Sequence, residues 1–258
     1  PTSTRSVVRG LTGMLARCHT RRGDLSAGGR GLGATPRDAW EHGRMNSFTT
    51  PPGRPEPFPG VPDAGTHMVL GTPMQGPWPD GTEVLYLAAG CFWGLERIFW
   101  KLPGVVTTAV GYQGGAMPSP TYEQVCTGTT GHAEAIRIVY EPRKITYGQL
   151  LKVFFSVAHD PTQLNRQGGD VGTQYRSAIF FADQAQREVA QRYIDQLDGA
   201  GVYNAPIVTA LEPLVAFYPA EDYHRDYAAQ NPDQAYIRNV AAPKAAKTRQ
   251  WFADRLKS

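Results

Sequence analysis

Cys91 stands where a short apolar run gives way to a helical pattern, a position from which a thiol can act as a nucleophile. Residues 84–89 have the length and composition of a buried strand, and apolar residues recur at helical spacing over 95–102. The backbone N–H groups and the dipole of a helix N-terminus favour the thiolate. We therefore predict a lowered pKa for Cys91, while a buried structural cysteine is the alternative.

Glu134 is the residue best placed to supply a proton to such a reaction. Alternation over residues 130–140 predicts a strand whose apolar face carries Glu134 at its entry end. Burial at that point would raise the pKa of the carboxyl and suit it to act as an acid. A glutamate turned out to water at the end of the strand is the alternative.

Aromatic and polar residues gather around these two groups. Phe92 and Trp93 follow the cysteine directly, and exposing them would be costly, so we expect them to wall an apolar slot. Tyr122 ends a loop rich in Gly and Pro, and a second glycine-rich loop delivers Asp170 and then Tyr175. A nucleophile, an apolar slot, a neutral acid and phenolic donors can together reduce or acylate a small group.

The composition excludes several other classes of protein. The 258 residues are 41% hydrophobic, enough for one substantial core. A net charge of +3 is too small to indicate a nucleic-acid-binding protein, and no apolar run reaches the ~18 residues of a membrane span. The three cysteines form no CxxC pair, which argues against a disulfide framework or a zinc site and fits a reducing compartment.

The chain divides into three predicted parts. Residues 1–80 are expected to be a disordered extension rich in Pro, Gly and Arg, residues 81–240 a catalytic domain, and residues 241–258 a basic tail. No acidic residue precedes Asp24, a composition that resembles an organelle transit peptide. There are two alternative interpretations of this extension. It is either a disordered basic tail or a stretch translated upstream of the true start, for which Met45 is the candidate. We expect a cytoplasmic protein, or an organellar one if the extension is a transit peptide.

The order of strand and helix patterns predicts an α+β fold. We expect a two-layer sandwich with a ferredoxin-like, split βαβ core and a mixed, largely antiparallel sheet. Thr146 with Gln149 forms a capping box, and Asp183 is placed to cap a second helix. His159 with Asp160 is interpreted as a turn lock, and His132 as a structural histidine.

Five motifs make the chain similar to the peptide methionine sulfoxide reductase A family. They are GCFWG at 90–94, TYEQVCTGTTGHAE at 121–134, HDPTQ at 159–163, GTQYRSA at 172–178 and AEDYH at 220–224. The resemblance covers roughly residues 82–240, in the order and at the spacing of that family. It implies a peptide-methionine (S)-S-oxide reductase that acts in oxidative-stress protein repair on oxidised proteins or free methionine sulfoxide.

The resemblance also implies a role for each matching residue. Cys91 would attack the sulfoxide sulfur and become a sulfenic acid, Glu134 would protonate the sulfoxide oxygen, and Tyr122 and Tyr175 would hydrogen-bond that oxygen. The substrate-binding residues would be Phe92 and Trp93 at the methyl group, Asp170 acting through water, and His224 and Tyr236 lining the site. No metal or cofactor is implied, nor a nucleic acid or a membrane, and we expect a monomer.

The chain departs from the family at the resolving cysteine. Many relatives carry one directly after the tyrosine that matches Tyr236, where this chain has Ile237, and no cysteine follows Cys126. We therefore expect a one-cysteine enzyme regenerated by an external thiol, either glutathione with glutaredoxin or thioredoxin. Resolution by Cys126 or by Cys18 stays open. The rival functions are a cysteine hydrolase with a histidine base and a non-enzymatic thiol redox sensor.

Overall fold

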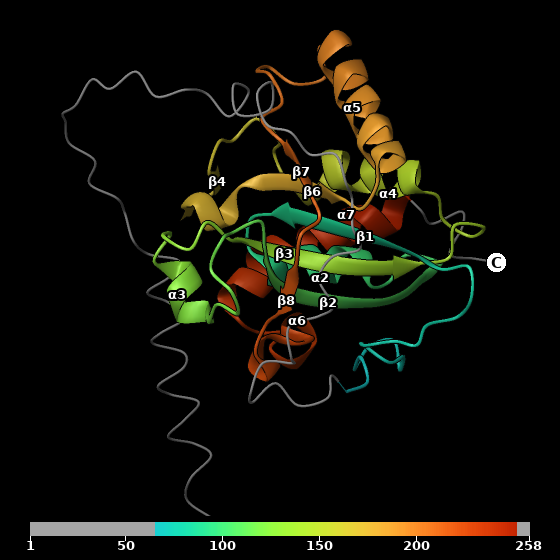
Figure 1. Ribbon diagram of the computed structural model, residues 1–258, viewed down its shortest axis with the longest axis vertical. Coiled ribbons are helices and arrows are strands. Elements are labelled where there is room, and N and C mark those ends of the chain that lie inside the picture. Colours follow the sequence, from blue (N-terminus) through green and yellow to red (C-terminus); the bar gives the residue numbers. More distant parts are fainter. Residues whose placement is uncertain (1–64, 252–258) are drawn as a thin grey trace, which may run out of the picture.

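A six-stranded sheet forms the centre of the computed structural model, which describes residues 65–251 (Figure 1). Its strand order is β7-β6-β1-β3-β2-β8, and every neighbouring pair is antiparallel except β6 with β7. The strands are β1 (Glu83–Ala89), β2 (Val105–Gln113), β3 (Ala133–Tyr140), β6 (Ser177–Phe181), β7 (Ala210–Pro213) and β8 (Phe217–Pro219). A separate hairpin pairs β4 (Arg166–Gln167) with β5 (Asp170–Val171).

Helices surround this sheet. They are α2 (Phe92–Phe99), α3 (Tyr122–Cys126), α4 (Tyr147–Val153), α5 (Gln184–Gly199), α6 (Tyr227–Gln230) and α7 (Ala242–Trp251). Two π-helical turns, η1 (Phe154–Ala158) and η4 (Ile237–Ala241), and two 3-10 turns, η2 (Thr173–Tyr175) and η3 (Asp222–His224), join them. Helix α2 packs on β1, β2 and β3, and α7 packs on α2, so both lie behind the central strands in Figure 1. The α+β class predicted from the order of the elements is confirmed.

The helix starts follow the predicted capping chemistry. Thr146 Oγ1 accepts a hydrogen bond from the Gln149 backbone N–H at 3.3 Å, and Gln149 Oε1 accepts one from the Thr146 N–H at 3.0 Å. Asp183 Oδ1 accepts from the Gln186 N–H at 2.8 Å and starts α5. These bonds satisfy N–H groups that have no partner inside the helix.

Strand β3 is buried along its whole length, on both faces of the sheet. Glu134, Ile136 and Ile138 are buried, as the predicted apolar face requires. Arg137, on the other face, is also only 6% exposed, and its guanidinium lies 5.0 Å from the ring centroid of Trp78. The second face is therefore covered, partly by a segment that precedes β1.

That covering segment corrects one prediction. Residues 65–80 fall in the extension expected to be unstructured, yet His67 and Met74 are 0% and 2% exposed. Thr72 Oγ1 donates to the Val106 carbonyl at 2.6 Å, and Thr66 forms an isolated β-bridge with Pro73. The segment packs through single side chains rather than a periodic face, which is why sequence periodicity gave no signal for it.

Other sequence-based expectations fall outside the described residues. These are the arginine-rich start of the chain, the alternative start at Met45, Cys18, and the end of the basic tail after residue 251. Within residues 65–251, no helix is both long and apolar enough to span a bilayer. No group of three or more His, Cys, Asp or Glu side chains in that same range is arranged to hold a metal ion.

Candidate active site

Cys91 lies at the junction of β1 and α2, where the sequence predicts it. It is the N-cap residue of α2, and its carbonyl accepts the Leu95 N–H at 3.3 Å. The preceding Gly90 has φ +80°, in the left-handed region that favours glycine. A Cβ at Gly90 would also lie only 2.7 Å from Cβ of Gln167, so the turn that presents the thiol requires glycine.

Glu134 approaches the same turn from β3. Its Oε2 accepts a hydrogen bond from the Phe92 backbone N–H at 3.0 Å, while Oε1 has no hydrogen-bond partner among the described residues. Burial raises the pKa of Glu134 to about 8; the Phe92 N–H opposes this rise and the charge of Asp170 adds to it. The carboxyl therefore holds a proton at neutral pH, in the direction that the strand pattern predicts.

The predicted lowering of the Cys91 pKa is wrong. The thiol is 2% exposed, and burial, followed by the charges of Glu134 and Asp170, raises its pKa well above the ordinary value. Hydrogen bonds from the Trp93 N–H and the Tyr236 hydroxyl act in the opposite direction. Burial and two nearby carboxyls outweigh one short helix. Protonation of Glu134 removes one of the two charges that disfavour the thiolate.

Three phenols lie around the thiol. Tyr122 Oη is buried and has no hydrogen-bond partner in the described part of the chain. Burial, and next the charge of Glu134, raises the pKa of both Tyr122 and Tyr175, so both keep their protons. Tyr236, at the start of η4, hydrogen-bonds the Cys91 sulfur. A protonated phenol is a hydrogen-bond donor, so these groups can bind an oxygen that develops negative charge near the sulfur.

An aromatic wall stands beside the thiol. Phe92, Trp93 and His224 are each at most 1% exposed. Trp93 Nε1 donates to His224 Nδ1 at 3.0 Å, and the His224 ring lies 5.1 Å from that of Phe92. Tyr227 stacks on Trp93 with ring centroids 3.8 Å apart and an interplanar angle of 12°. Burial lowers the pKa of His224 to about 3, so this histidine is neutral and the wall carries no charge.

Two residues that support the site were not found from the sequence. Glu221 Oε1 accepts from the Tyr122 N–H at 2.8 Å, and its Oε2 accepts from Tyr112 Oη at 2.7 Å, so it fixes α3 against β2. Tyr227 completes the aromatic wall. Both belong to the run of aromatic and acidic residues at 217–227, a compositional signal that does not say which members face the site.

A carboxylate and a cation lie on the other side of the thiol. Asp170, at the start of β5, is 7% exposed, and its charge acts on both Cys91 and Glu134. Lys244 of α7 donates from Nζ to the Ala158 carbonyl at 2.8 Å. Burial lowers the pKa of Lys244, while Asp170 and Cys91 raise it. No local pattern of the sequence predicts that Lys244 lies at the site.

Comparisons with known proteins agree with this geometry. The sequence model of the family described as peptide methionine sulfoxide reductase matches residues 83–256, more than half of the chain. The chain belongs to the peptide methionine sulfoxide reductase family. Peptide methionine sulfoxide reductase MsrA 2 of Mesorhizobium japonicum is 54% identical over 172 residues, which are 67% of this chain and 88% of that protein.

Two further relatives extend the comparison. The MsrA protein of Agrobacterium fabrum is 53% identical over 188 residues, covering 71% of this chain and 85% of its own. The solved structure of methionine sulfoxide reductase A of Corynebacterium diphtheriae superposes with a TM-score of 0.59 at 44% identity, covering 68% of this chain and 86% of that one. An enzyme of the reductase family, predicted from five motifs, is thereby confirmed.

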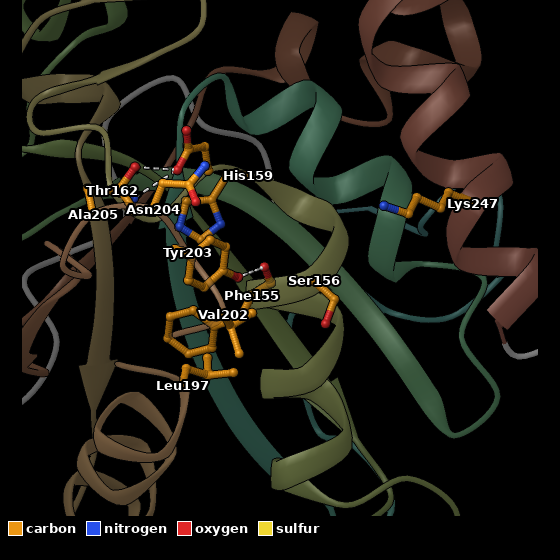
Figure 2. Close-up of a pocket in the computed structure, with 11 residues that line it drawn as sticks. Phe155, Ser156, His159, Thr162, Leu197, Val202, Tyr203, Asn204, Ala205 and Lys247 are labelled. Carbon is orange, nitrogen blue, oxygen red and sulfur yellow. Dashed lines mark hydrogen bonds between the residues drawn. The ribbon is translucent and has the colours of Figure 1, made fainter. Parts of the chain in front are cut away.

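Away from the reductase site, a pocket of about 540 Å³ lies between η1, the end of α5 and the loop that follows it (Figure 2). Its lining includes Asp160, whose side chain holds a turn, and His159, whose ring connects η1 to β6. His159 Nε2 lies 2.7 Å from Ser177 Oγ, and Asp160 Oδ1 accepts from the Thr162 hydroxyl at 2.7 Å. Burial lowers the pKa of His159 to about 3. The predicted turn lock is confirmed for Asp160, while His159 bonds outside the turn.

Proposed function

We propose that this protein reduces methionine-S-sulfoxide, peptidyl or free, to methionine through thiol chemistry at Cys91. One observation carries the proposal. A buried, proton-bearing Glu134 is hydrogen-bonded to the backbone N–H of Phe92, the residue after the nucleophile. Sulfoxide oxygen is a poor leaving group until it is protonated, so the reaction needs an acid of raised pKa at that position.

The reaction balances without a cofactor. The Cys91 sulfur attacks the sulfoxide sulfur while Glu134 gives its proton to the oxygen. The S–O bond and the newly formed S–S bond then break, the oxygen and its new proton finish on Cys91 as a sulfenic acid, the thiol proton of Cys91 restores Glu134, and methionine leaves. The sulfoxide sulfur gains two electrons and the Cys91 sulfur loses two. Tyr122 and Tyr175 donate hydrogen bonds to the oxygen as its charge develops.

We assign recognition of the methyl group to the aromatic wall. Phe92 and Trp93 present buried apolar surface, and the neutral His224 behind them adds no charge. The phenols and Glu134 recognise the S–O dipole, and Asp170 orders this polar side through water. A site with one apolar and one polar wall can distinguish the two epimers of the sulfoxide, for which separate enzymes exist.

We propose a one-cysteine mechanism of regeneration. One external thiol attacks the Cys91 sulfenic acid, forming a mixed disulfide and water, and a second thiol releases Cys91 and leaves as the disulfide. The residues beside the thiol support this mechanism. Tyr236 hydrogen-bonds the Cys91 sulfur, and the residue that follows it is the buried Ile237, which cannot form a disulfide with Cys91. The proposed reductants are glutathione with glutaredoxin, or thioredoxin. Half-buried Cys126, the last residue of α3, is disulfide-bonded in the structure, and it is the alternative resolving residue once that bond is reduced.

Two structural proposals accompany this function. The antiparallel order β6-β1-β3-β2 supports a ferredoxin-like, split βαβ core. We also propose that residues 81–240 carry the catalysis, with residues 65–80 and α7 packed against them as supports. Because the enzyme depends on reduced thiols, we propose that it acts in a reducing compartment, the cytoplasm. We also propose that it acts as a monomer.

The geometry favours reduction over the two rival functions. A cysteine hydrolase needs a histidine base at the thiol, but His224 Nδ1 accepts from Trp93, and no histidine in residues 65–251 hydrogen-bonds Cys91. A redox sensor would not need an acid beside the thiol. The test is multiple turnover of the S and R epimers with dithiothreitol, for the wild type and Cys91→Ser. We expect turnover of the S epimer by the wild type alone; equal turnover by Cys91→Ser, or none by either, overturns the proposal.

A further inference from the structure

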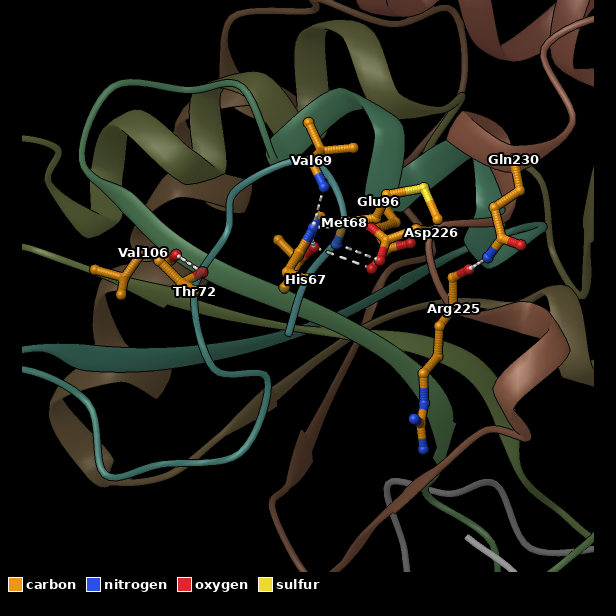
Figure 3. A network of polar contacts seen from close by, with 10 residues as sticks. His67, Met68, Val69, Thr72, Glu96, Val106, Arg225, Asp226 and Gln230 are labelled. Atoms are coloured by element: carbon orange, nitrogen blue, oxygen red, sulfur yellow. Dashed lines mark hydrogen bonds and ion pairs between the residues drawn. The ribbon is translucent and has the colours of Figure 1, made fainter. Parts of the chain in front are cut away.

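Four buried polar side chains connect the segment before β1 to α2, to β2 and to the start of α6 (Figure 3). They are His67, Glu96, Thr108 and Asp226, each at most 3% exposed. Burial of polar groups is unfavourable unless they are hydrogen-bonded to one another, so such a cluster holds its elements in one arrangement. None of the four takes part in the chemistry proposed above.

His67 is the centre of this cluster. Its Nδ1 lies 2.7 Å from Asp226 Oδ1 and 3.2 Å from the Val69 backbone nitrogen, and its Nε2 lies 2.8 Å from Thr108 Oγ1. The Thr108 hydroxyl in turn donates to Glu96 Oε1 at 3.0 Å. The neighbouring Met68 N–H donates to Asp226 Oδ2 at 2.8 Å, so the same short segment contacts both carboxylate oxygens, Oδ2 through a hydrogen bond and Oδ1 through the His67 ring.

Asp226 needs such support because its backbone is left-handed. Its φ is 49° and its ψ 26°, a conformation that residues other than glycine rarely adopt. Left-handed residues persist where the surroundings fix them. Here two contacts from residues 67–68 fix the carboxylate, and with it the turn that leads into α6.

The turn at Asp226 lies between two residues of the aromatic wall. His224 precedes it by two positions and accepts the hydrogen bond of Trp93 Nε1 at 3.0 Å. Tyr227 follows it directly and stacks on the Trp93 ring at 3.8 Å. Glu96, at the other end of the cluster, is one turn beyond Trp93 on α2. A shift of the left-handed turn would therefore move both partners of Trp93 together.

We propose that His67 is a positioning residue of the active site. By holding Asp226 in its left-handed turn, it sets the placement of His224 and Tyr227 against Trp93, and so the affinity for the methyl group of the sulfoxide. This role rests on the proposed function, since it concerns the pocket for that substrate. The cluster touches neither the thiol nor Glu134, so the chemical step is unaffected.

The experiment compares the full-length wild type with His67→Ala, His67→Asn and Thr72→Val. For methionine-S-sulfoxide with dithiothreitol, we expect His67→Ala to raise KM roughly tenfold, the size of a lost polar contact with a charged group, with kcat little changed. Asparagine can place a donor where Nδ1 stands, so His67→Asn should recover most of the affinity. Thr72→Val removes a hydrogen bond of the same segment to Val106, away from Asp226, and should leave KM unchanged.

An NMR readout separates positioning from general loosening. The indole N–H resonance of Trp93, assigned with Trp93→Phe, should shift in His67→Ala, return in His67→Asn and stay in place in Thr72→Val. The proposal is overturned if His67→Ala and Thr72→Val change the KM and the Trp93 resonance equally. It is also overturned if His67→Ala changes neither. If His67→Ala does not fold, Asp226→Asn takes its place, because asparagine tolerates the left-handed backbone. Its KM and its Trp93 resonance are then judged by the same criteria. A wild type without reductase activity would reject the proposed function, while the resonance would still decide the positioning role.

Discussion

Glu134 and Phe92 are 42 residues apart in sequence, yet Glu134 Oε2 accepts a hydrogen bond from the Phe92 backbone N–H at 3.0 Å. This contact joins the strand that carries the acid to the first residue of the helix that follows the nucleophile. It fixes one carboxylate oxygen and leaves Oε1 without a hydrogen-bond partner among the described residues. The second oxygen is therefore the one available to a substrate.

The first prediction concerns Glu134→Gln. A glutamine oxygen can still accept from the Phe92 N–H, so the turn should remain intact, but an amide cannot donate the proton that the sulfoxide oxygen needs. We expect kcat to fall by about 10²- to 10⁴-fold, the usual contribution of a general acid, with KM changed much less. Steady-state kinetics with methionine-S-sulfoxide and dithiothreitol measure both. A variant with wild-type kcat would remove Glu134 from the role of acid.

The second prediction is a dependence of stability on pH. Burial raises the pKa of Glu134 from 4.5 to about 8, and does the same to Glu96, whose pKa the charge of Asp226 also raises. A raised folded-state pKa means that the folded chain binds the proton more tightly than the unfolded chain. This stabilisation is complete below about pH 4.5 and is lost as the pH rises through 8.

Urea unfolding from pH 7 to pH 8.5 tests this sign, because buried His159 and His224, whose pKa burial lowers from 6.5 to about 3, change stability with pH only below that range. The free energy of unfolding of the wild type should decline across that range, and Glu96→Gln and Glu134→Gln should each show a shallower decline, since the amide does not ionise. Glu123, exposed on α3, gives Glu123→Gln as a matched control that should follow the wild type. Stability that rises with pH in the wild type would contradict the burial of protonated carboxyls.

The third prediction concerns the glycine before the nucleophile. Gly90→Ala places a Cβ at φ +80° and 2.7 Å from Gln167 Cβ, so the turn must shift and carry Cys91 with it. We expect a loss of about 1–3 kcal/mol in the free energy of unfolding and a fall in kcat. Gly148→Ala, in α4 with nothing within 4 Å of the new Cβ, is the control and should be neutral or slightly stabilising. Equal effects of the two variants would show that the turn at Cys91 has no special geometry.

The fourth prediction concerns the resolving thiol. If an external thiol regenerates Cys91, then Cys126→Ser should keep turnover with glutathione and glutaredoxin, while Cys91→Ser should have none. Turnover is measured as methionine formed from the S epimer under each reductant. Loss of turnover in Cys126→Ser with thioredoxin as the reductant would identify Cys126 as the resolving cysteine and reject the one-cysteine mechanism.

The sequence predicted the parts of the site that rest on local patterns. Residues close together in the chain determine three of these features. They are the junction of strand and helix at Cys91, the raised pKa of Glu134, and the capping of α4 and α5. The positive φ of Gly90 is also a local feature, but no prediction was made for it from the sequence.

Long-range contacts explain what the sequence did not reveal. Burial raises the pKa of Cys91, and the two carboxyls that β3 and β5 bring to the helix start raise it further; no local pattern encodes that meeting. Lys244 comes from α7, and His67 from a segment without periodicity. Such residues show their roles only when the elements that carry them are packed together.

The most direct test of the central claim is a single turnover without reductant. Fully reduced protein is mixed with excess methionine-S-sulfoxide, methionine is counted by chromatography, and the site of oxidation is found by mass spectrometry after trapping with dimedone. We expect one methionine per protein molecule, a sulfenic acid on Cys91, and much slower formation of both in Glu134→Gln. Methionine formed while Cys91 stays a thiol, or no methionine from the S epimer, would contradict it.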